Sequence, residues 1–234
     1  MVIITGVSRG LGKAIAEKFL AKGDYVHGIG RSTDLEHPCF TFSKCDLSNL
    51  DEIRELKFDV LSGPVTLINN AGIIGEIKQM SKQQPLNIDE VFTVNVSAPA
   101  IITNHVYQQC LDKGKFTLVN ISSGAARRAI PSWASYCASK AALNMLSETF
   151  FLEERELGND IKVFAVSPGV MDTGMQEQIR ATRVEDFSTV EVFRHRKETD
   201  DMLSPSEAAD RVMVLLDRDY NEQVLVSLAD IAAE

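Results

Sequence analysis

The sequence lacks the features that mark secreted, membrane-spanning and metal-binding proteins. Its four cysteines are irregularly spaced with no Cys-x-x-Cys pair, which is typical of small buried thiols in a reducing compartment. Its four histidines form no His-x-x-x-His or His-Glu-x-x-His group, so we expect no metal site. No apolar run reaches the length of a membrane span, and the opening residues MVIITG are typical of a strand that enters a glycine turn, not of a signal peptide. We therefore expect a cytoplasmic protein that has no membrane partner.

Basic residues are also scarce relative to acidic ones. The chain has 24 lysines and arginines against 33 aspartates and glutamates, a formal net charge of −9 at pH 7. Proteins that bind nucleic acid usually carry a basic patch or stripe, so this balance argues against a nucleic-acid partner. The 44% of hydrophobic residues is ordinary for a folded domain, and 234 residues are enough to bury a substantial core.

Short apolar segments alternate with amphipathic segments along the chain. The predicted strands are 2–5, 25–30, 39–46, 65–69, 116–122, 162–168 and 223–228, and the predicted helices are 11–22, 86–111, 136–157 and 205–218. The last helix begins at SPSE, where Ser204 is the expected N-cap, Pro205 occupies the first turn and Glu207 closes a capping box. Continuously apolar strands that alternate with helices indicate a parallel sheet covered on both faces. We therefore predict a single α/β domain over residues 1–234.

Residues 170–203 interrupt this alternation. The segment is highly charged, and it is long for a connection inside a compact domain. The sequences MQEQI and VEVF within it suggest short helices that fold over a site. We expect a lid that is mobile when the site is empty, because its apolar residues are too few for firm contact with a core. These residues are Met175, Ile179, Phe187, Val190, Val192 and Phe193.

A glycine-rich loop, TGVSRGLG at residues 5–12, follows the first predicted strand and opens the first predicted helix. Gly6, Gly10 and Gly12 allow the backbone to turn sharply and to approach a pyrophosphate at the N-terminus of that helix. The spacing differs from the common Gly-x-Gly-x-x-Gly pattern, and a glycine loop alone could be a simple tight turn. Its position between a strand and a helix favours a nucleotide site.

The end of the second predicted strand indicates which dinucleotide would bind. An acidic residue there would hold the adenosine ribose hydroxyls, but this chain has Arg31 and Ser32. An arginine can bind a 2′-phosphate through charge-assisted hydrogen bonds, and Arg9 in the glycine loop could add a second positive charge. Either arginine could instead be merely solvated, but together they favour NADP(H) over NAD(H).

The stretch SYCASK places Tyr136 and Lys140 one helical turn apart with no carboxylate between them. A phenol with its ordinary pKa near 10 exchanges protons poorly at neutral pH. A nearby ammonium favours the phenolate, so we expect Lys140 to lower the pKa of Tyr136. This pair alone is weak evidence of function, since such spacings also arise by chance.

Together with other motifs in the same order, the pair is similar to the short-chain dehydrogenase/reductase family over essentially the whole chain. The motifs are TGVSRGLG, NNAG (69–72), Asn95 in TVNVSAP, NISS (120–123), YCASK (136–140) and SPGVMDT (167–173). WASYCASKAALNM and SPGVMDTGMQ resemble most the sepiapterin reductase branch and the bacterial benzil reductases. The resemblance implies a Rossmann-type, doubly wound parallel sheet of about seven strands with helices on both faces.

The resemblance also implies a role for each residue of the catalytic set. Tyr136 would donate the proton, Ser123 would hydrogen-bond the substrate oxygen with Ser122 as the less favoured neighbour, and Lys140 would also bind the nicotinamide ribose. Asn95 would hold a water molecule in the proton relay, and it could equally serve as a structural residue at a helix bend.

The cofactor contacts that the resemblance implies are spread along the chain. Asp46 and Leu47 match positions beside the adenine, and Val170 and Thr173 match positions beside the nicotinamide carboxamide. The full set is Gly6, Ser8, Arg9, Gly10, Leu11, Gly12, Arg31, Ser32, Asp46, Leu47, Asn70, Ala71, Gly72, Tyr136, Lys140, Pro168, Gly169, Val170 and Thr173.

The substrate contacts are less sharply indicated. Trp133 lies near the expected position of a flat substrate but could equally be core packing. Met175 and Ile179, with Phe187, would form an apolar wall against a substrate ring. Asp230 matches the aspartate that anchors the pterin in sepiapterin reductases, although it could be solvated.

These observations predict an NADPH-dependent carbonyl reductase acting on a small ketone or vicinal diketone. The alternatives are an NAD(P)-dependent alcohol dehydrogenase working in the oxidising direction and a catalytically silent dinucleotide-binding regulator. The region 136–151 is apolar on more than one face, so we expect a homodimer through helix 136–157, with a tetramer also open.

Overall fold

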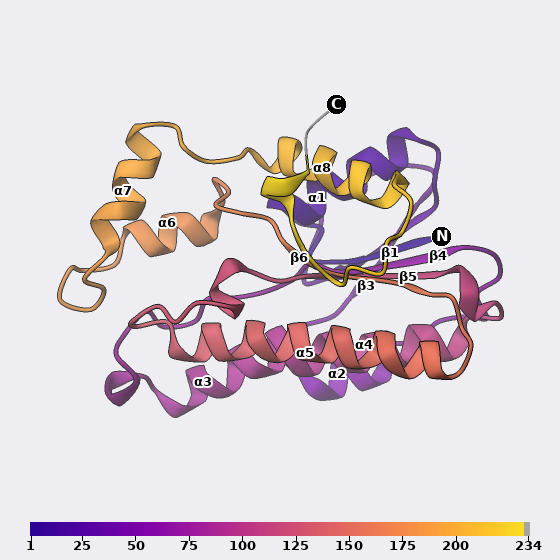
Figure 1. The fold of residues 1–234 in the computed structure, drawn as a ribbon, viewed down its shortest axis with the longest axis horizontal. Coiled ribbons are helices and arrows are strands. Elements are labelled where there is room, and N and C mark those ends of the chain that lie inside the picture. Colours follow the sequence, from indigo (N-terminus) through magenta and orange to yellow (C-terminus); the bar gives the residue numbers. More distant parts are fainter. Residues whose placement is uncertain (232–234) are drawn as a thin grey trace.

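The computed structural model describes residues 1–231, which form a parallel sheet between two layers of helices (Figure 1). The strands are β1 (Val2–Thr5), β2 (Val26–Gly30), β3 (Phe40–Lys44), β4 (Val65–Asn69), β5 (Phe116–Ile121), β6 (Lys162–Ser167) and β7 (Leu225–Ser227). The sheet has seven strands in the order β3-β2-β1-β4-β5-β6-β7, and every neighbouring pair is parallel. The chain adds strands outward from β1 to β3 and then crosses to the other side of β1 to add β4 and the strands after it. The connections after β1 and β4 therefore run in opposite directions, which opens a crevice at the carboxyl ends of these strands. The predicted fold class and strands are confirmed.

Two helical layers cover the sheet (Figure 1). α1 (Gly10–Ala21) and α8 (Pro205–Asp217) lie on one face, and α2 (Leu50–Glu55), α4 (Ala98–Gln109) and α5 (Ala134–Glu156) lie on the other. Successive side chains of a strand point to opposite faces of the sheet: Ile4 packs with the core beneath α1 and α8, and Ile3 packs with the core beneath α4. Because both faces are covered, the central strands β1, β4, β5 and β6 are buried along nearly their whole length, without an alternating pattern.

The start of α8 has the predicted chemistry. Ser204 accepts a hydrogen bond from the Glu207 backbone at 3.2 Å, and the Glu207 side chain accepts one from the Ser204 backbone at 2.8 Å. This reciprocal pair is the capping box expected from SPSE, so the local sequence alone positions the last helix.

The predicted helix 86–111 is broken near its middle. It consists of α3 (Pro85–Phe92), a π-helical turn at Thr93–Ser97, and α4. Asn95 lies in this turn and is fully buried. The helix bend that the sequence associated with Asn95 is therefore present, and π-helical turns occur frequently at functional sites.

Residues 170–203 leave the carboxyl edge of the sheet and return to nearly the same point (Figure 1). They contain α6 (Gly174–Arg180) and α7 (Val190–Glu198), which confirms the expectation of short helices. The backbone of Leu203 donates a hydrogen bond to Val170 at 3.0 Å and accepts one from Asp172 at 3.0 Å, so the two ends of the segment are joined. We call residues 170–203 the lid segment.

The expectation that the lid segment lacks firm core contacts is wrong. Ile179, Phe187 and Val190 are each no more than 1% exposed and form a third apolar cluster. Their partners come from other parts of the chain, among them Ile74, Ile77 and Trp133. These few apolar residues form a firm contact because side chains from the loop after β4, the loop after β5 and the start of α5 enclose them.

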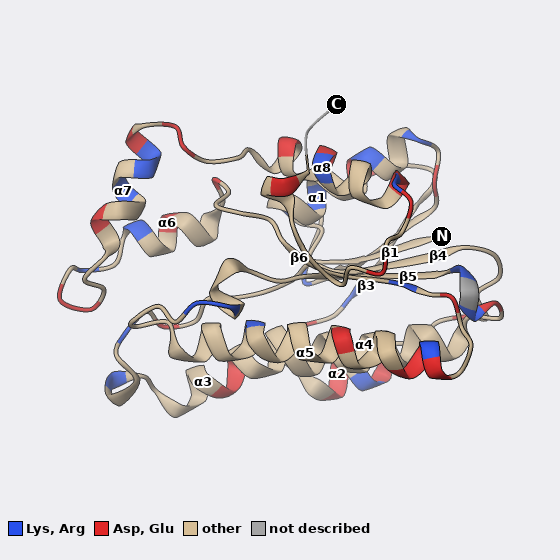
Figure 2. Ribbon diagram, viewed as in Figure 1, with Lys and Arg blue, Asp and Glu red and all other residues tan. Residues whose placement is uncertain are grey.

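Charged residues of both signs are mixed along the helices, and α7 in the lid segment carries both (Figure 2). Within residues 1–231, no helix has the length and apolar content needed to cross a membrane.

Candidate active site

A cavity of about 930 Å³ lies at the carboxyl ends of the strands, at the crevice between the connections that follow β1 and β4. It is lined by the loops that follow β1, β2, β3, β4, β5 and β6 and by the start of the lid segment. Most of the predicted cofactor residues line it. They are Gly6, Ser8, Arg9, Gly10, Leu11, Arg31, Ser32, Asp46, Leu47, Asn70, Ala71, Gly72, Tyr136, Lys140, Pro168, Gly169, Val170 and Thr173.

The glycines of the loop after β1 have different roles. Gly6 and Gly10 have φ angles of 76° and 62°, which favour glycine, and both line the cavity. Gly12 does not line it within the described structure: a Cβ at this position would lie 2.3 Å from the Gly6 carbonyl and 2.3 Å from Nδ2 of Asn70. Gly12 therefore lets α1 pack against the loop after β4, which corrects its predicted contact with a pyrophosphate.

Arg9 and Arg31 form a positively charged end of the cavity. Both are exposed, and neither takes part in an ion pair or side-chain hydrogen bond within residues 1–231. Close to them, hydrogen bonds from the Ser48 backbone and hydroxyl, with a smaller effect of Arg31, hold the pKa of Asp46 below its usual value. The two guanidinium groups thus remain available for an anion.

The predicted catalytic side chains meet at the other end of the cavity. Tyr136 and Lys140 lie on the first turns of α5, and Ser123 begins the short 3-10 turn after β5. Tyr136 is 6% exposed and Lys140 is 3% exposed, so both are shielded from water. The Nζ of Lys140 donates a hydrogen bond to the Ile121 carbonyl at 2.8 Å.

Burial changes the pKa of both groups. It lowers the pKa of Lys140 to about 8. It also raises the pKa of Tyr136, although the nearby Ser123 hydroxyl opposes this shift. The predicted lowering of the Tyr136 pKa by Lys140 is therefore wrong for the protein alone, because loss of water penalises the phenolate and the ammonium is bonded to Ile121.

The two neighbouring serines are engaged differently. The hydroxyl of Ser122 donates to the Asn144 side chain at 2.5 Å, whereas the hydroxyl of Ser123 accepts a hydrogen bond from the Ala125 backbone at 3.1 Å and lies close to Tyr136. Ser123 therefore lies beside the Tyr136 hydroxyl, where a substrate oxygen could reach both groups, whereas Ser122 is bonded to Asn144.

Asn95 does not line the cavity in the described structure. Its amide exchanges hydrogen bonds with the backbone of Ile73, accepting at 2.9 Å and donating at 2.8 Å, and it also donates to Ser139 at 3.0 Å. These bonds tie the π-helical turn to the loop after β4 and to α5. They support the structural alternative for Asn95.

The substrate end of the cavity is mostly apolar. Trp133, Met175 and Ile179 line it as predicted, but Phe187 is fully buried behind them. The ring centroid of Trp133 lies 5.4 Å from that of Phe187 and 5.4 Å from that of Phe193. Phe193 also lines the cavity and was not predicted to do so. Its place in VEVF, a short helix expected to fold over the site, could have indicated this contact.

Asp230 lies outside this site. It is exposed at the end of the 3-10 turn Leu228–Asp230 and is not among the described residues that line the cavity. The turn buries Leu228 and Ile231 in the core beneath α1 and α8, which directs the aspartate to the surface. This position supports the alternative of a solvated aspartate over a pterin anchor at Asp230.

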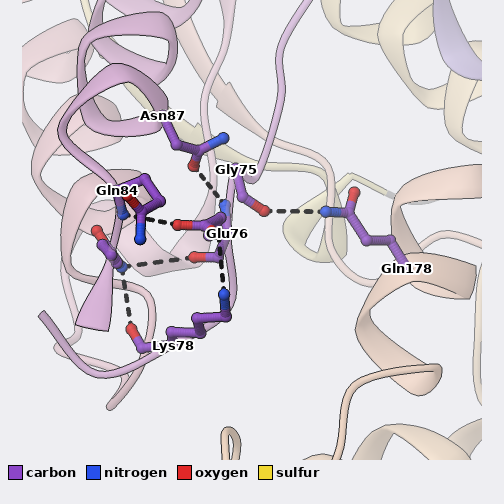
Figure 3. Close-up of polar contacts among 7 residues, drawn as sticks. Gly75, Glu76, Lys78, Gln84, Asn87 and Gln178 are labelled. Atoms are coloured by element: carbon purple, nitrogen blue, oxygen red, sulfur yellow. Dashed lines mark hydrogen bonds and ion pairs between the residues drawn. The ribbon is translucent and has the colours of Figure 1, made fainter.

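Two glutamines join the lid segment to the loop after β4. Gln178 on α6 donates to the Gly75 carbonyl at 2.9 Å (Figure 3), and Gln79 donates to the Glu185 carbonyl at 3.1 Å. We call these two bonds the glutamine clasp. They hold the lid segment against the loop after β4, beside the cavity wall formed by Ile74, Met175 and Ile179.

The loop that carries Gly75 is itself held in shape (Figure 3). The backbone of Glu76 donates to the Asn87 side chain at 2.6 Å. Its carboxylate accepts from the Gln84 backbone at 2.8 Å and from the Lys78 ammonium at 2.9 Å. These bonds, that of Gln84 first, hold the pKa of the Glu76 carboxyl below its usual value. The clasp therefore fastens the lid segment to a stiff loop.

This fold and cavity define a nicotinamide-dinucleotide oxidoreductase, and comparison with known proteins agrees. The model of the short chain dehydrogenase family matches residues 1–184, and the chain belongs to that family. It is 37% identical to a benzil reductase ((S)-benzoin forming) of Bacillus subtilis over 93% of each chain. It is 30% identical to an NADPH-dependent pterin aldehyde reductase of Arabidopsis thaliana, over 74% of this chain and 75% of that one.

A crystal structure of a short chain dehydrogenase/reductase from Saccharomyces cerevisiae has the same fold. Its TM-score is 0.81 at 26% identity, covering 98% of this chain and 96% of that one. The benzil-type and pterin-type relatives that the sequence motifs indicated are thus both represented.

Proposed function

We propose that this protein is an NADPH-dependent reductase of small ketones, including vicinal diketones. The observation that carries the proposal is the convergence of Ser123, Tyr136 and Lys140 at one end of a cavity whose opposite end carries two arginines without an ion-pair partner among residues 1–231. The benzil reductase and pterin aldehyde reductase among its relatives support the same reaction class.

The residues present fit a phosphorylated dinucleotide. Gly6 and Gly10 and the open N-terminus of α1 suit a pyrophosphate, because backbone N–H groups there lack partners within the helix. A Cβ at Gly72 would lie 3.3 Å from the Nζ of Lys140, so only glycine leaves that space open. Arg9 and Arg31 would bind the 2′-phosphate, with Ser32 beside them.

NADPH would supply the hydride that reduces the carbonyl carbon and would leave as NADP⁺. Ser123 would hold the carbonyl oxygen, and Tyr136 would transfer its hydroxyl proton to that oxygen as the carbon–oxygen double bond becomes a single bond. Lys140 has three N–H donors and uses one on Ile121, so the others are free for the ribose hydroxyls. Its charge would also stabilise the phenolate that Tyr136 becomes.

The lid segment would open for substrate entry and close for reaction. Its joined ends at Val170 and Leu203 allow it to move as one unit, and the glutamine clasp is exposed and breakable. Closure would exclude water from the hydride path.

We also propose a homodimer in the cytoplasm. α5 exposes an apolar stripe at helical spacing: Ala138, Ala141, Met145 and Leu152, the last two being 64% and 58% exposed. A two-fold contact would cover this stripe. Sedimentation of the native protein and of Met145→Glu should show a dimer or tetramer and a smaller species, respectively; no difference would place the contact elsewhere.

The reaction is tested by following NADPH oxidation with a panel of aryl ketones, vicinal diketones and pterin carbonyl compounds. The proposal expects turnover with at least one vicinal diketone and a much slower rate with NADH. Absence of turnover across the panel, together with oxidation of alcohols by NADP⁺ or NAD⁺, would instead support a dehydrogenase working in the oxidising direction.

A further inference from the structure

Trp133 follows a strained residue, and its side chain is incompletely hydrogen-bonded. Ser132, directly before it, has a φ of 71°, a left-handed conformation that residues with a side chain rarely adopt. The indole is 6% exposed, and its Nε1–H has no hydrogen-bond partner among residues 1–231. Buried donors are nearly always paired. An apolar ring would leave no donor unpaired, so the apolar contacts alone do not account for a buried N–H at this position.

The missing partner is expected from the cavity. Trp133 forms part of its wall beside Tyr136, and the two ring centroids are 5.7 Å apart in an edge-to-face arrangement. If Tyr136 protonates the reacting carbonyl, the indole lies next to the atoms that flank that carbonyl. An indole N–H can only donate, so its partner must be an acceptor.

A second polar group is left unpaired in the same wall. Gln176 on α6 lines the cavity and is 9% exposed, and its Oε1 has no partner within the described structure. The indole itself packs against Phe187 and Phe193 of the lid segment. The N–H therefore lies under a segment held by the glutamine clasp, and a ligand would reach it as that segment moves.

Building on the carbonyl reduction proposed above, we propose that the Trp133 N–H donates a hydrogen bond to a second oxygen of the substrate, on the carbon next to the reacting carbonyl. Trp133 is then a specificity-determining residue. The site selects α-dicarbonyls and α-oxygenated ketones over simple ketones, because a simple ketone leaves the donor unpaired in the closed site.

The kinetic test compares benzil with deoxybenzoin, which has the same two rings but a methylene in place of one carbonyl. In Trp133→Phe, kcat/KM for benzil should fall about three- to tenfold, while the value for deoxybenzoin changes less than twofold. As a control, Phe193→Leu disturbs the packing around the indole but keeps the N–H, so both values should fall by the same factor. Equal losses for both substrates in Trp133→Phe would overturn the proposal and leave a packing role.

A second test needs no turnover. Trp133 is the only tryptophan of the chain, so the ¹⁵N-labelled protein gives a single indole N–H resonance. In the protein loaded with NADP⁺, benzil should move that proton downfield and deoxybenzoin should not. If benzil shifts backbone resonances of the cavity but leaves the indole proton in place, the hydrogen bond does not exist. Because this readout is independent of catalysis, it separates failure of this inference from failure of the proposed reaction.

Discussion

The ammonium nitrogen of Lys140 lies 5.9 Å from the ring centroid of Tyr136 and gives its hydrogen bond to Ile121. The two groups share a buried pocket without being bonded to each other. Burial favours the neutral form of each group, so it raises the pKa of Tyr136 and lowers the pKa of Lys140. In the protein alone, burial thus opposes ionisation of the phenol that we propose as the proton donor.

The buried Lys140 should make stability depend on pH. Its pKa is about 8 in the folded protein against 10.5 as the ordinary value, so between these pH values the unfolded chain binds a proton that the native chain does not. The free energy of unfolding should therefore rise with pH across that window, by roughly 3 kcal/mol at most.

Lys140→Met removes this titration, so the variant should be about 1–3 kcal/mol more stable than the native protein at pH 7 and lose that advantage by pH 10.5. Urea unfolding at several pH values measures this. The matched control is Lys57→Met, because Lys57 is exposed and its replacement should leave the pH dependence unchanged. A native protein whose stability is flat between pH 8 and 10.5 relative to Lys140→Met would show that Lys140 is not buried as described.

Arg31 should select the cofactor together with Arg9. Charge-assisted hydrogen bonds are worth about 1.5–3 kcal/mol each, so Arg31→Asp should lower the ratio of NADPH to NADH affinity by roughly tenfold or more. Fluorescence titration of both dinucleotides measures the ratio. Arg218→Asp makes the same charge change at an exposed residue outside the cavity lining and should leave the ratio within twofold. Equal binding of NADPH and NADH by the native protein would remove the phosphate assignment.

The glutamine clasp should restrain the lid segment. Gln178→Ala deletes one neutral hydrogen bond, worth about 0.5–1.5 kcal/mol, so amide exchange in residues 174–193 should accelerate about two- to tenfold. NADP⁺ with a substrate analogue should slow exchange there in the native protein. Gln108→Ala, at an exposed site on α4, is the control and should leave this region unaffected. Exchange that is unchanged by both the variant and the ligands would mean that the segment does not act as a lid.

Because Asp230 lies at the surface, we expect its replacement to have no effect on catalysis. Asp230→Asn should change kcat/KM for a pterin carbonyl substrate and for a diketone by less than twofold, because the carboxylate does not reach the cavity. A loss confined to the pterin substrate, measured by NADPH oxidation, would show that the chain end moves into the site when substrate binds.

The fold could be predicted wherever it depends on local pattern. Strands buried on both faces are continuous apolar runs, so VIIT and VTLIN identify β1 and β4 directly. The capping box at Ser204 and Glu207 similarly places α8 within a residue. The loops that build the cavity follow these strands, so most candidate cofactor residues could also be located from sequence.

What could not be predicted depends on contacts between distant segments. The burial of Phe187 follows from groups on the loop after β4 and at the start of α5, which no local pattern in 170–203 reveals. The role of Gly12 depends on where Asn70 lies, and the raised pKa of Tyr136 depends on how much water the assembled pocket excludes. The direction of Asp230 depends on Leu228 and Ile231, which pack on the opposite side of the turn.

The most direct test of the account is the rate of NADPH oxidation with benzil in Tyr136→Phe against the native protein. The variant keeps the ring and removes the proton, so turnover should fall by about 10² or more while NADPH affinity stays within twofold. Near-native turnover in Tyr136→Phe would contradict the assignment of Tyr136 as proton donor, and with it the reading of this cavity as a carbonyl reductase site.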